Sequence, residues 1–202
     1  GLGNSNFKTS TNQAPRKSTT GEKGSALKIR LELRSFADIG LVGLPNAGKS
    51  TFLDAVSSAK PKIGDYPFTT IKPNLGTIKY FDKSFVFADI PGLIEGASQG
   101  TGLGIKFLKH ISRTKALLIF LDPHNTEHDF ENQLKILTNE MRHFDSKLLQ
   151  KDMWIVLNKI DTVDNLDENL STIDKYIPKE LKINKIRGIS SISKQGVKEL
   201  FD

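Results

Sequence analysis

The segment Gly43–Ser50 has the residue types and the spacing of a phosphate-binding loop, since it fits the pattern G-x-x-x-x-G-K-[ST]. Small residues let the backbone curl so that its N–H groups point at a phosphate, and the start of a following helix adds positive potential. Lys49 would then contact the β- and γ-phosphates, as a binding and a catalytic group, and the Ser50 hydroxyl would ligate Mg²⁺. A chance match is expected in about one chain in a hundred. The residues predicted to contact the nucleotide here are Gly43, Leu44, Pro45, Asn46, Ala47, Gly48, Lys49, Ser50 and Thr51.

The elements around this loop predict an α/β fold. An apolar run over 37–42 indicates a strand before the loop, and the apolar spacing over 51–56 indicates a helix after it. Further strands are expected over 75–80, 85–88, 116–121, 153–157 and 186–189, and further helices over 105–112, 129–144, 166–177 and from 197 to the end. Residues 60–73 are expected to form a proline-containing loop. Strands alternating with helices predict a P-loop NTPase fold with a mainly parallel sheet covered by helices on both faces.

A second motif, Asn158-Lys159-Ile160-Asp161, selects the base. The carboxylate of Asp161 can accept hydrogen bonds from the ring N–H and the exocyclic amine of guanine, whereas adenine presents no such pair and leaves the carboxylate unpaired. The stem of Lys159 can lie on the base, and Asn158 can tie this segment to the phosphate loop. Its position directly after a predicted strand strengthens the prediction of a guanine site.

Three further segments complete the predicted site. In Asp89-Ile90-Pro91-Gly92, Asp89 can hold Mg²⁺ through water and the Gly92 N–H can meet a γ-phosphate. The glycine-rich stretch that follows would be ordered by that phosphate and released on hydrolysis. In the segment 65–70, a threonine hydroxyl could complete the Mg²⁺ shell, with Thr70 favoured over Thr69. Ser190, Ser191 and Ile192 follow the last predicted strand and could contact the guanine through their N–H groups.

Composition and charge set the broad class. The 202 residues contain no cysteine, which suits a reducing compartment, and no apolar run long enough to span a bilayer. The formal charge of +6 is concentrated in residues 1–35, which hold seven basic residues against Glu22 and Glu32. This basic leader indicates contact with an anionic partner such as RNA or, equally, a solvated segment that aids solubility. Residues 27–34 alternate apolar and polar side chains, which predicts a half-buried strand.

The order and spelling of these motifs resemble the Obg/CgtA family of GTPases. The resemblance rests on Gly43–Thr51, on 59–63, on 65–70, on 73–76 and on 89–98 with its continuation to 110. It covers residues 36–202, as a GTP-binding domain whose last helix is expected to be cut short. Residues 1–35 resemble the tail of that family's glycine-rich N-terminal domain, so we expect a piece of a longer protein.

The resemblance implies a Mg²⁺-dependent switch that binds GTP and GDP and hydrolyses GTP slowly. Catalysis would rest on Lys49, Thr70 and Gly92. The implied partner is the large ribosomal subunit, in its assembly and in stress-linked control. We expect a cytoplasmic monomer with no membrane span, or an organellar protein if a targeting segment has been removed.

The residue after Gly92 bears on mechanism, because many GTPases place a water-orienting Gln there and this chain has Leu93. Gln99 could replace it, although a surface Gln is the stronger interpretation. Asn46 matches the residue that helps bind K⁺ in related potassium-activated GTPases, so K⁺ is a candidate second cofactor.

Two competing functions stay open. One is a P-loop ATPase or nucleotide kinase, in which Asn158–Asp161 would have no role. The other is a GTP/GDP-sensing module with negligible turnover, which Leu93 favours. A metal site at His124 and His128 is also conceivable, but a solvated loop after a strand is the stronger interpretation.

Overall fold

The computed structural model describes residues 1–29, 37–58, 62–63, 74–89 and 114–201. The chain forms two compact units, Gly1–Glu32 and Leu33–Asp202. In the first unit the 3₁₀ helix η1 (Asn4–Phe7) is followed by extended chain, and the Lys17 ammonium lies 5.6 Å from the centre of the Phe7 ring. Residues 27–29, the start of a predicted strand, are not in a strand, and Leu27 is 83% exposed. The rest of that prediction lies outside the described residues.

Within the described residues, the second unit is built on one seven-stranded sheet with the order β2-β3-β4-β1-β5-β6-β7. The strands from β4 to β7 in this order run parallel, and β3 and β2 are antiparallel additions at one edge. The strand bounds are β1 (Ile39–Gly43), β2 (Lys62–Ile63), β3 (Asn74–Tyr80), β4 (Lys83–Asp89), β5 (Ala116–Leu121), β6 (Asp152–Leu157) and β7 (Lys182–Gly188). Because β5 is apolar and buried at every position, it reads in the sequence as the continuous run typical of a central parallel strand.

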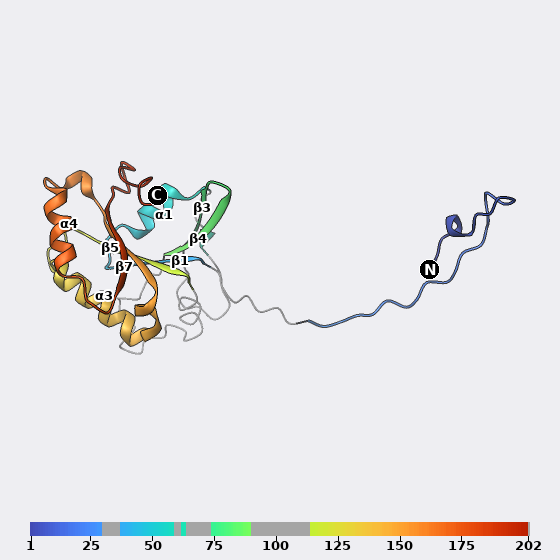
Figure 1. The fold of residues 1–202 in the computed structure, drawn as a ribbon, viewed down its shortest axis with the longest axis horizontal. Helices are drawn as coiled ribbons and strands as arrows, with labels where there is room; N and C mark the ends of the chain where they lie inside the picture. The colour runs from blue at the N-terminus through green and yellow to red at the C-terminus, as the bar shows by residue number, and fades with distance from the viewer. Residues whose placement is uncertain (30–36, 59–61, 64–73, 90–113, 202) are drawn as a thin grey trace. The chain divides into compact units, whose positions relative to one another are not determined.

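Helices cover both faces of this sheet, as predicted. In the described part of the chain they are α1 (Lys49–Val56), α3 (Phe130–Phe144) and α4 (Leu166–Lys175). Figure 1 shows α3 and α4 on one side of the sheet and α1, with the C-terminal turns, on the other. The two apolar cores agree: one joins the buried side of α3 to β5 and β6, and the other packs Phe52 and Leu53 of α1 against Phe87 and Phe120.

The predicted α/β P-loop fold with a mainly parallel sheet is therefore confirmed, with local differences. The segment predicted as a proline-containing loop includes the two-residue strand β2. This strand pairs with β3 and has no sequence pattern from which it could be predicted. Strand β7 begins four residues before its predicted start, because at this edge of the sheet exposed polar residues such as Lys182 and Lys185 alternate with its isoleucines. Residues 195–201 form turns instead of a helix, with the Leu200 N–H donating to the Gly196 carbonyl. The predicted helix over 105–112 lies outside the described residues.

Asp38, just before β1, connects this central strand to β4 and to the residue before β5. Its carboxylate should make the stability of the fold depend on pH in the acid range. Its carboxylate accepts a hydrogen bond from the Val86 N–H at 3.0 Å and pairs with the Lys115 ammonium at 2.9 Å. Burial, the largest single influence, raises the pKa of Asp38, but the hydrogen bonds from Val86 and Lys115 together with the charge of Lys115 outweigh it and lower the pKa.

A lowered pKa in the folded state means that ionised Asp38 favours folding above the unfolded pKa, and that this contribution is lost as pH falls through the lowered value. We therefore expect Asp38→Asn to lose stability less steeply than the parent protein between about pH 5 and pH 2. Urea unfolding at a series of pH values measures this slope. Equal slopes for the two proteins would contradict the prediction.

Candidate functional site

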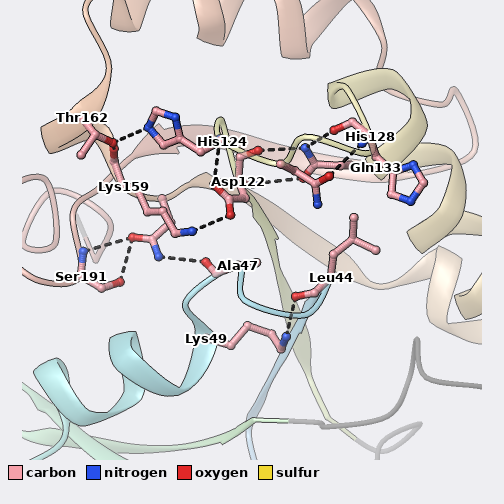
Figure 2. Close-up of polar contacts among 12 residues, drawn as sticks. Leu44, Ala47, Lys49, Asp122, His124, His128, Gln133, Lys159, Thr162 and Ser191 are labelled. Carbon is pink, nitrogen blue, oxygen red and sulfur yellow. Dashed lines mark hydrogen bonds and ion pairs between the residues drawn. The ribbon is translucent and has the colours of Figure 1, made fainter.

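The predicted phosphate loop lies at the carboxyl edge of the sheet, between the end of β1 and the start of α1. Two of its residues have left-handed backbone, Asn46 with φ 62° and Gly48 with φ 88°. The Lys49 ammonium donates to the carbonyl oxygens of Gly43 at 2.9 Å and Leu44 at 3.1 Å (Figure 2). The Lys49 side chain thus folds back from the start of α1 to the first two residues of the loop.

Neighbouring atoms lie so close to Gly43 and Gly48 that neither position has room for a side chain. A Cβ on Gly43 would lie 2.8 Å from the Phe120 carbonyl oxygen of the neighbouring strand. A Cβ on Gly48 would lie 2.1 Å from Nδ2 of Asn158. Such distances are well inside van der Waals contact, so only glycine lets the loop approach β5 and the Asn158 side chain this closely.

The Mg²⁺ prediction is tested by the chemistry of Ser50 and Asp89. The Ser50 hydroxyl donates to Oδ2 of Asp89, which ends β4 and is only 3% exposed. The other carboxylate oxygen, Oδ1, is buried and has no hydrogen-bond partner among the described residues. A hydroxyl beside a carboxylate with an unpaired buried oxygen is a set of hard oxygen donors, so these residues fit Mg²⁺.

Asn158 joins three loops at this edge. It follows β6, is 2% exposed, and its amide nitrogen donates to the Ala47 carbonyl of the phosphate loop at 2.9 Å. Its amide oxygen accepts from the N–H of Ser191 at 3.1 Å and from the Ser191 hydroxyl at 2.9 Å (Figure 2). The predicted tie between Asn158 and the phosphate loop is therefore confirmed, and the serine segment is held by the same side chain.

The groups expected to contact the base are arranged around Asn158. Asp161, in the 3₁₀ turn η4 (Ile160–Thr162), is exposed, and its carboxylate makes no hydrogen bond or ion pair with the part of the chain that the structure describes. Both carboxylate oxygens of Asp161 are thus free to accept hydrogen bonds from guanine. An unpaired carboxylate disfavours adenine only if the bound base shields it from water, so this discrimination requires the base to cover Asp161. Ser190 is fully buried, whereas Ile192 is 79% exposed.

Asp122 belongs to this edge, although the motifs did not identify it. It directly follows β5, its side chain is 7% exposed, and its Oδ2 lies 2.5 Å from the Lys159 ammonium. With Leu44 and Asn46 it also lines a polar pocket of about 530 Å³ beside the phosphate loop. The available sequence signal was its place after a buried strand, since such positions meet at the carboxyl edge of the sheet.

Several predicted residues lie outside the described part of the chain. They are Thr70, Ile90, Pro91 and Gly92, together with Thr69, Leu93 and Gln99. The proposed catalytic roles of Thr70 and Gly92 stay predictions. Of the predicted catalytic groups, the structure describes Lys49, and of the two predicted metal ligands it describes Ser50.

The alternative metal site at His124 and His128 receives no support. No group of three His, Asp or Glu residues suited to a metal occurs within the described ranges. The His124 ring instead contacts the Thr162 hydroxyl at 2.5 Å (Figure 2). His124 is exposed, as the solvated-loop interpretation expects, but it also has a partner that this interpretation did not include. Among the described helices, none is long and apolar enough to cross a membrane.

The fold and this edge together define a P-loop protein of the nucleoside-triphosphate-binding class. Residues 38–159 match the family described as 50S ribosome-binding GTPase. The chain belongs to this family, which agrees with the resemblance to Obg-type GTPases noted in its motifs.

Individual relatives and structures extend this comparison. GTPase Obg of Psychrobacter sp. (strain PRwf-1) is 53% identical over 184 residues, which cover 90% of this chain and 45% of that protein. The chain thus spans about half the length of this curated relative. A GDP complex of a GTP-binding protein from the archaeon Sulfolobus solfataricus has a TM-score of 0.65 at 21% identity, covering 80% of this chain and 49% of that one. The G domain of the T. maritima FeoB iron transporter has a TM-score of 0.59 at 21% identity, covering 81% and 92%. At these identities the two structures support the fold.

Proposed function

We propose that this chain is a GTP/GDP switch that hydrolyses GTP with Mg²⁺. The observation that carries the proposal is the set of three hydrogen bonds through which Asn158 connects the phosphate loop, the guanine segment and the serine segment. A base held by Asp161 and a phosphate chain held by Gly43–Ser50 would then have a fixed separation. Membership of the 50S ribosome-binding GTPase family supports the same reading.

Each residue has a distinct role in this proposal. Lys49 leaves its carbonyl partners to neutralise the β- and γ-phosphates, and Asp161 accepts hydrogen bonds from guanine. Bound Mg²⁺ would supply positive charge beside the phosphates. Ser50 would hold it directly, and Asp89 would hold it through water. Backbone N–H groups would complete the site. On the phosphates these would come from Leu44, Asn46, Ala47, Gly48 and Thr51, with those of Ile90 and Gly92 beside them, whereas Pro45 and Pro91 have no N–H and would contact the nucleotide through other atoms. On the base the N–H of Ile192 would donate, because the N–H groups of Ser190 and Ser191 already donate to the Gln195 carbonyl and to Oδ1 of Asn158, so these two serines would shape the base site without donating to it.

Ser50 should make nucleotide binding depend on Mg²⁺. We expect Ser50→Ala to weaken GTP binding about tenfold in Mg²⁺ buffer, because the hydroxyl ligand is lost, and to change it little in EDTA. Titration calorimetry in both buffers measures the difference. Ser50→Thr keeps the hydroxyl and is the matched control. An equal loss for Ser50→Ala with and without Mg²⁺ would show that the hydroxyl does not act through the metal.

We propose the large ribosomal subunit as partner, in a role in its assembly and in stress-linked control, with the protein acting as a cytoplasmic monomer. The support is the family's description as ribosome-binding and the similarity to GTPase Obg. The basic charge concentrated in residues 1–35 suits contact with ribosomal RNA. A ribosomal partner would agree with a cytoplasmic location.

Leu93 replaces the Gln that orients water in many GTPases, so we propose slow intrinsic turnover that needs another group. K⁺ next to Asn46 would supply the positive charge that an arginine finger gives elsewhere, an effect of up to about 10³–10⁵ in rate for the finger itself. We therefore expect faster GTP hydrolysis in K⁺ buffer than in Na⁺ buffer, measured as phosphate release under multiple turnover. Asn46→Ala should lose the difference. Equal rates in the two buffers would remove K⁺ from the mechanism.

Titration calorimetry with GDP, GTP and ATP tests the proposed function as a whole. Tight GDP and GTP binding with no detectable ATP binding supports the guanine site, whereas comparable ATP and GDP affinities would refute it and favour an ATPase or nucleotide kinase.

Leu93 favours one second candidate, a GTP/GDP-sensing module with negligible turnover. Multiple-turnover phosphate release separates that module from the GTPase.

A further inference from the structure

The loop after β5, residues 122–128, contacts residues 158–162 at two points. We call these segments the β5 exit loop and the guanine loop. In one contact, Oδ2 of Asp122 lies 2.5 Å from the Lys159 ammonium. In the other, Nε2 of His124 lies 2.5 Å from the Thr162 hydroxyl. Figure 2 shows both contacts side by side, with the ring of His128, from the same loop, directed away from them.

Hydrogen bonds to residues other than Lys159 hold Asp122 in place. Its N–H donates to Oε1 of Gln133 at 3.1 Å and its carbonyl accepts from Nε2 of Gln133 at 2.9 Å. Gln133 lies in the first turns of α3 and is 1% exposed. The remaining carboxylate oxygen, Oδ1, accepts from the His124 N–H at 2.9 Å. A buried carboxylate with this many fixed partners is a rigid acceptor, so it can hold the Lys159 ammonium in one position.

The guanine loop is held through Lys159 at the main chain as well. Lys159 has left-handed backbone with φ 63°, and its carbonyl accepts from the Thr162 hydroxyl at 2.7 Å. Because that hydroxyl gives its proton to Lys159, its oxygen accepts from His124, which makes Nε2 of His124 the donor. Both contacts of the β5 exit loop therefore end on Lys159, one at its ammonium and the other, through Thr162, at its backbone.

We propose that Asp122 and His124 are positioning residues for the guanine base, acting through Lys159. This inference rests on the proposed function, in which the Lys159 stem lies on the base. A free lysine loses much rotamer freedom when it is ordered, which lowers affinity. With its ammonium held by Asp122 and its backbone held by Thr162, Lys159 is ordered in the nucleotide-free protein, so less of that cost falls on binding.

A double-mutant cycle between Asp122 and Lys159 tests the first contact. By titration calorimetry with GDP, Asp122→Asn should raise Kd about tenfold, as expected for loss of a partly exposed charged hydrogen bond. Lys159→Met should raise Kd at least as much, and adding Asp122→Asn to Lys159→Met should have no further effect. An unchanged Kd in Asp122→Asn, or effects that add in the double variant, would overturn the proposal, because a merely structural aspartate lowers affinity whichever residue stands at 159.

The second contact gives an independent cycle at exposed positions, where folding is not at risk. His124→Ala and Thr162→Val should each raise the Kd for GDP about threefold, and the double variant should match the single variants. His128→Ala removes an imidazole from the same loop without touching the guanine loop, and should leave Kd unchanged. If Asp122→Asn does not fold, this cycle decides, and additive effects would overturn the proposal.

The parent protein separates this inference from the function on which it rests. Failure of the parent to bind GDP would refute the proposed function and the inference together. GDP binding by the parent that is insensitive to Asp122, His124 and Thr162 would refute the inference alone. In either case, thermal unfolding of the nucleotide-free variants shows whether a change in Kd accompanies a loss of fold.

Discussion

Asp161→Ala should raise the Kd for GDP about a thousandfold while leaving the melting temperature of the nucleotide-free protein unchanged. Two hydrogen bonds from guanine to a carboxylate are lost, and bonds to charged groups are each worth about 1.5–3 kcal/mol. Stability should be unaffected because the carboxylate is exposed and makes no hydrogen bond with the described residues. Calorimetry with GDP and a thermal melt without nucleotide measure the two quantities.

Matched variants sharpen this result. Asp164→Ala removes an exposed carboxylate three positions away and so makes the same change in net charge, and it should bind GDP like the parent. In Asp161→Asn the side chain offers one donor and one acceptor, which match the C2 carbonyl and the ring N–H of xanthine. We therefore expect Asp161→Asn to bind XDP better than GDP. Equal GDP affinity in Asp161→Ala and the parent would show that another group reads the base.

Much of the phosphate and base site could be predicted from sequence because its contacts need contiguous residues of fixed type. A curled backbone needs the small residues of Gly43–Ser50, and the chemistry of guanine needs a carboxylate at Asp161. Their placement at one edge followed from the strand pattern, since parallel strands bring their carboxyl ends together. The buried run of β5 and the amphipathic pattern of α3 made the fold predictable for the same reason.

The parts that could not be predicted depend on contacts between segments distant in the chain. Asp122 is one aspartate among many until the sheet places it 2.5 Å from the Lys159 ammonium. His124 gives no sign of Thr162, which lies 38 residues away in sequence. Strand β2 has two residues, too few for any alternation, and exists through its pairing with β3. The apolar residues Val197 and Leu200 fit a helix, yet they pack against the sheet from a series of turns.

Gly48→Ala should weaken nucleotide binding strongly and destabilise the protein. The left-handed backbone of Gly48, with φ 88°, costs a residue with a Cβ about 1–2 kcal/mol. The added Cβ would also lie 2.1 Å from Nδ2 of Asn158, so either the phosphate loop or the Asn158 side chain must move. Movement of either breaks the 2.9 Å hydrogen bond from Asn158 to Ala47 and leaves buried polar groups without partners.

The two consequences of this substitution can be measured separately. The Kd for GDP should rise by at least about a hundredfold, and the free energy of unfolding should fall by about 2–4 kcal/mol in urea denaturation. Gly24→Ala is the matched control, because no atom lies within 4 Å of its added Cβ. Normal GDP binding by Gly48→Ala would show that the phosphate loop does not need the close approach to Asn158. The hydrogen bonds of Asn158 could then no longer be taken as what fixes the distance between the phosphate and base sites.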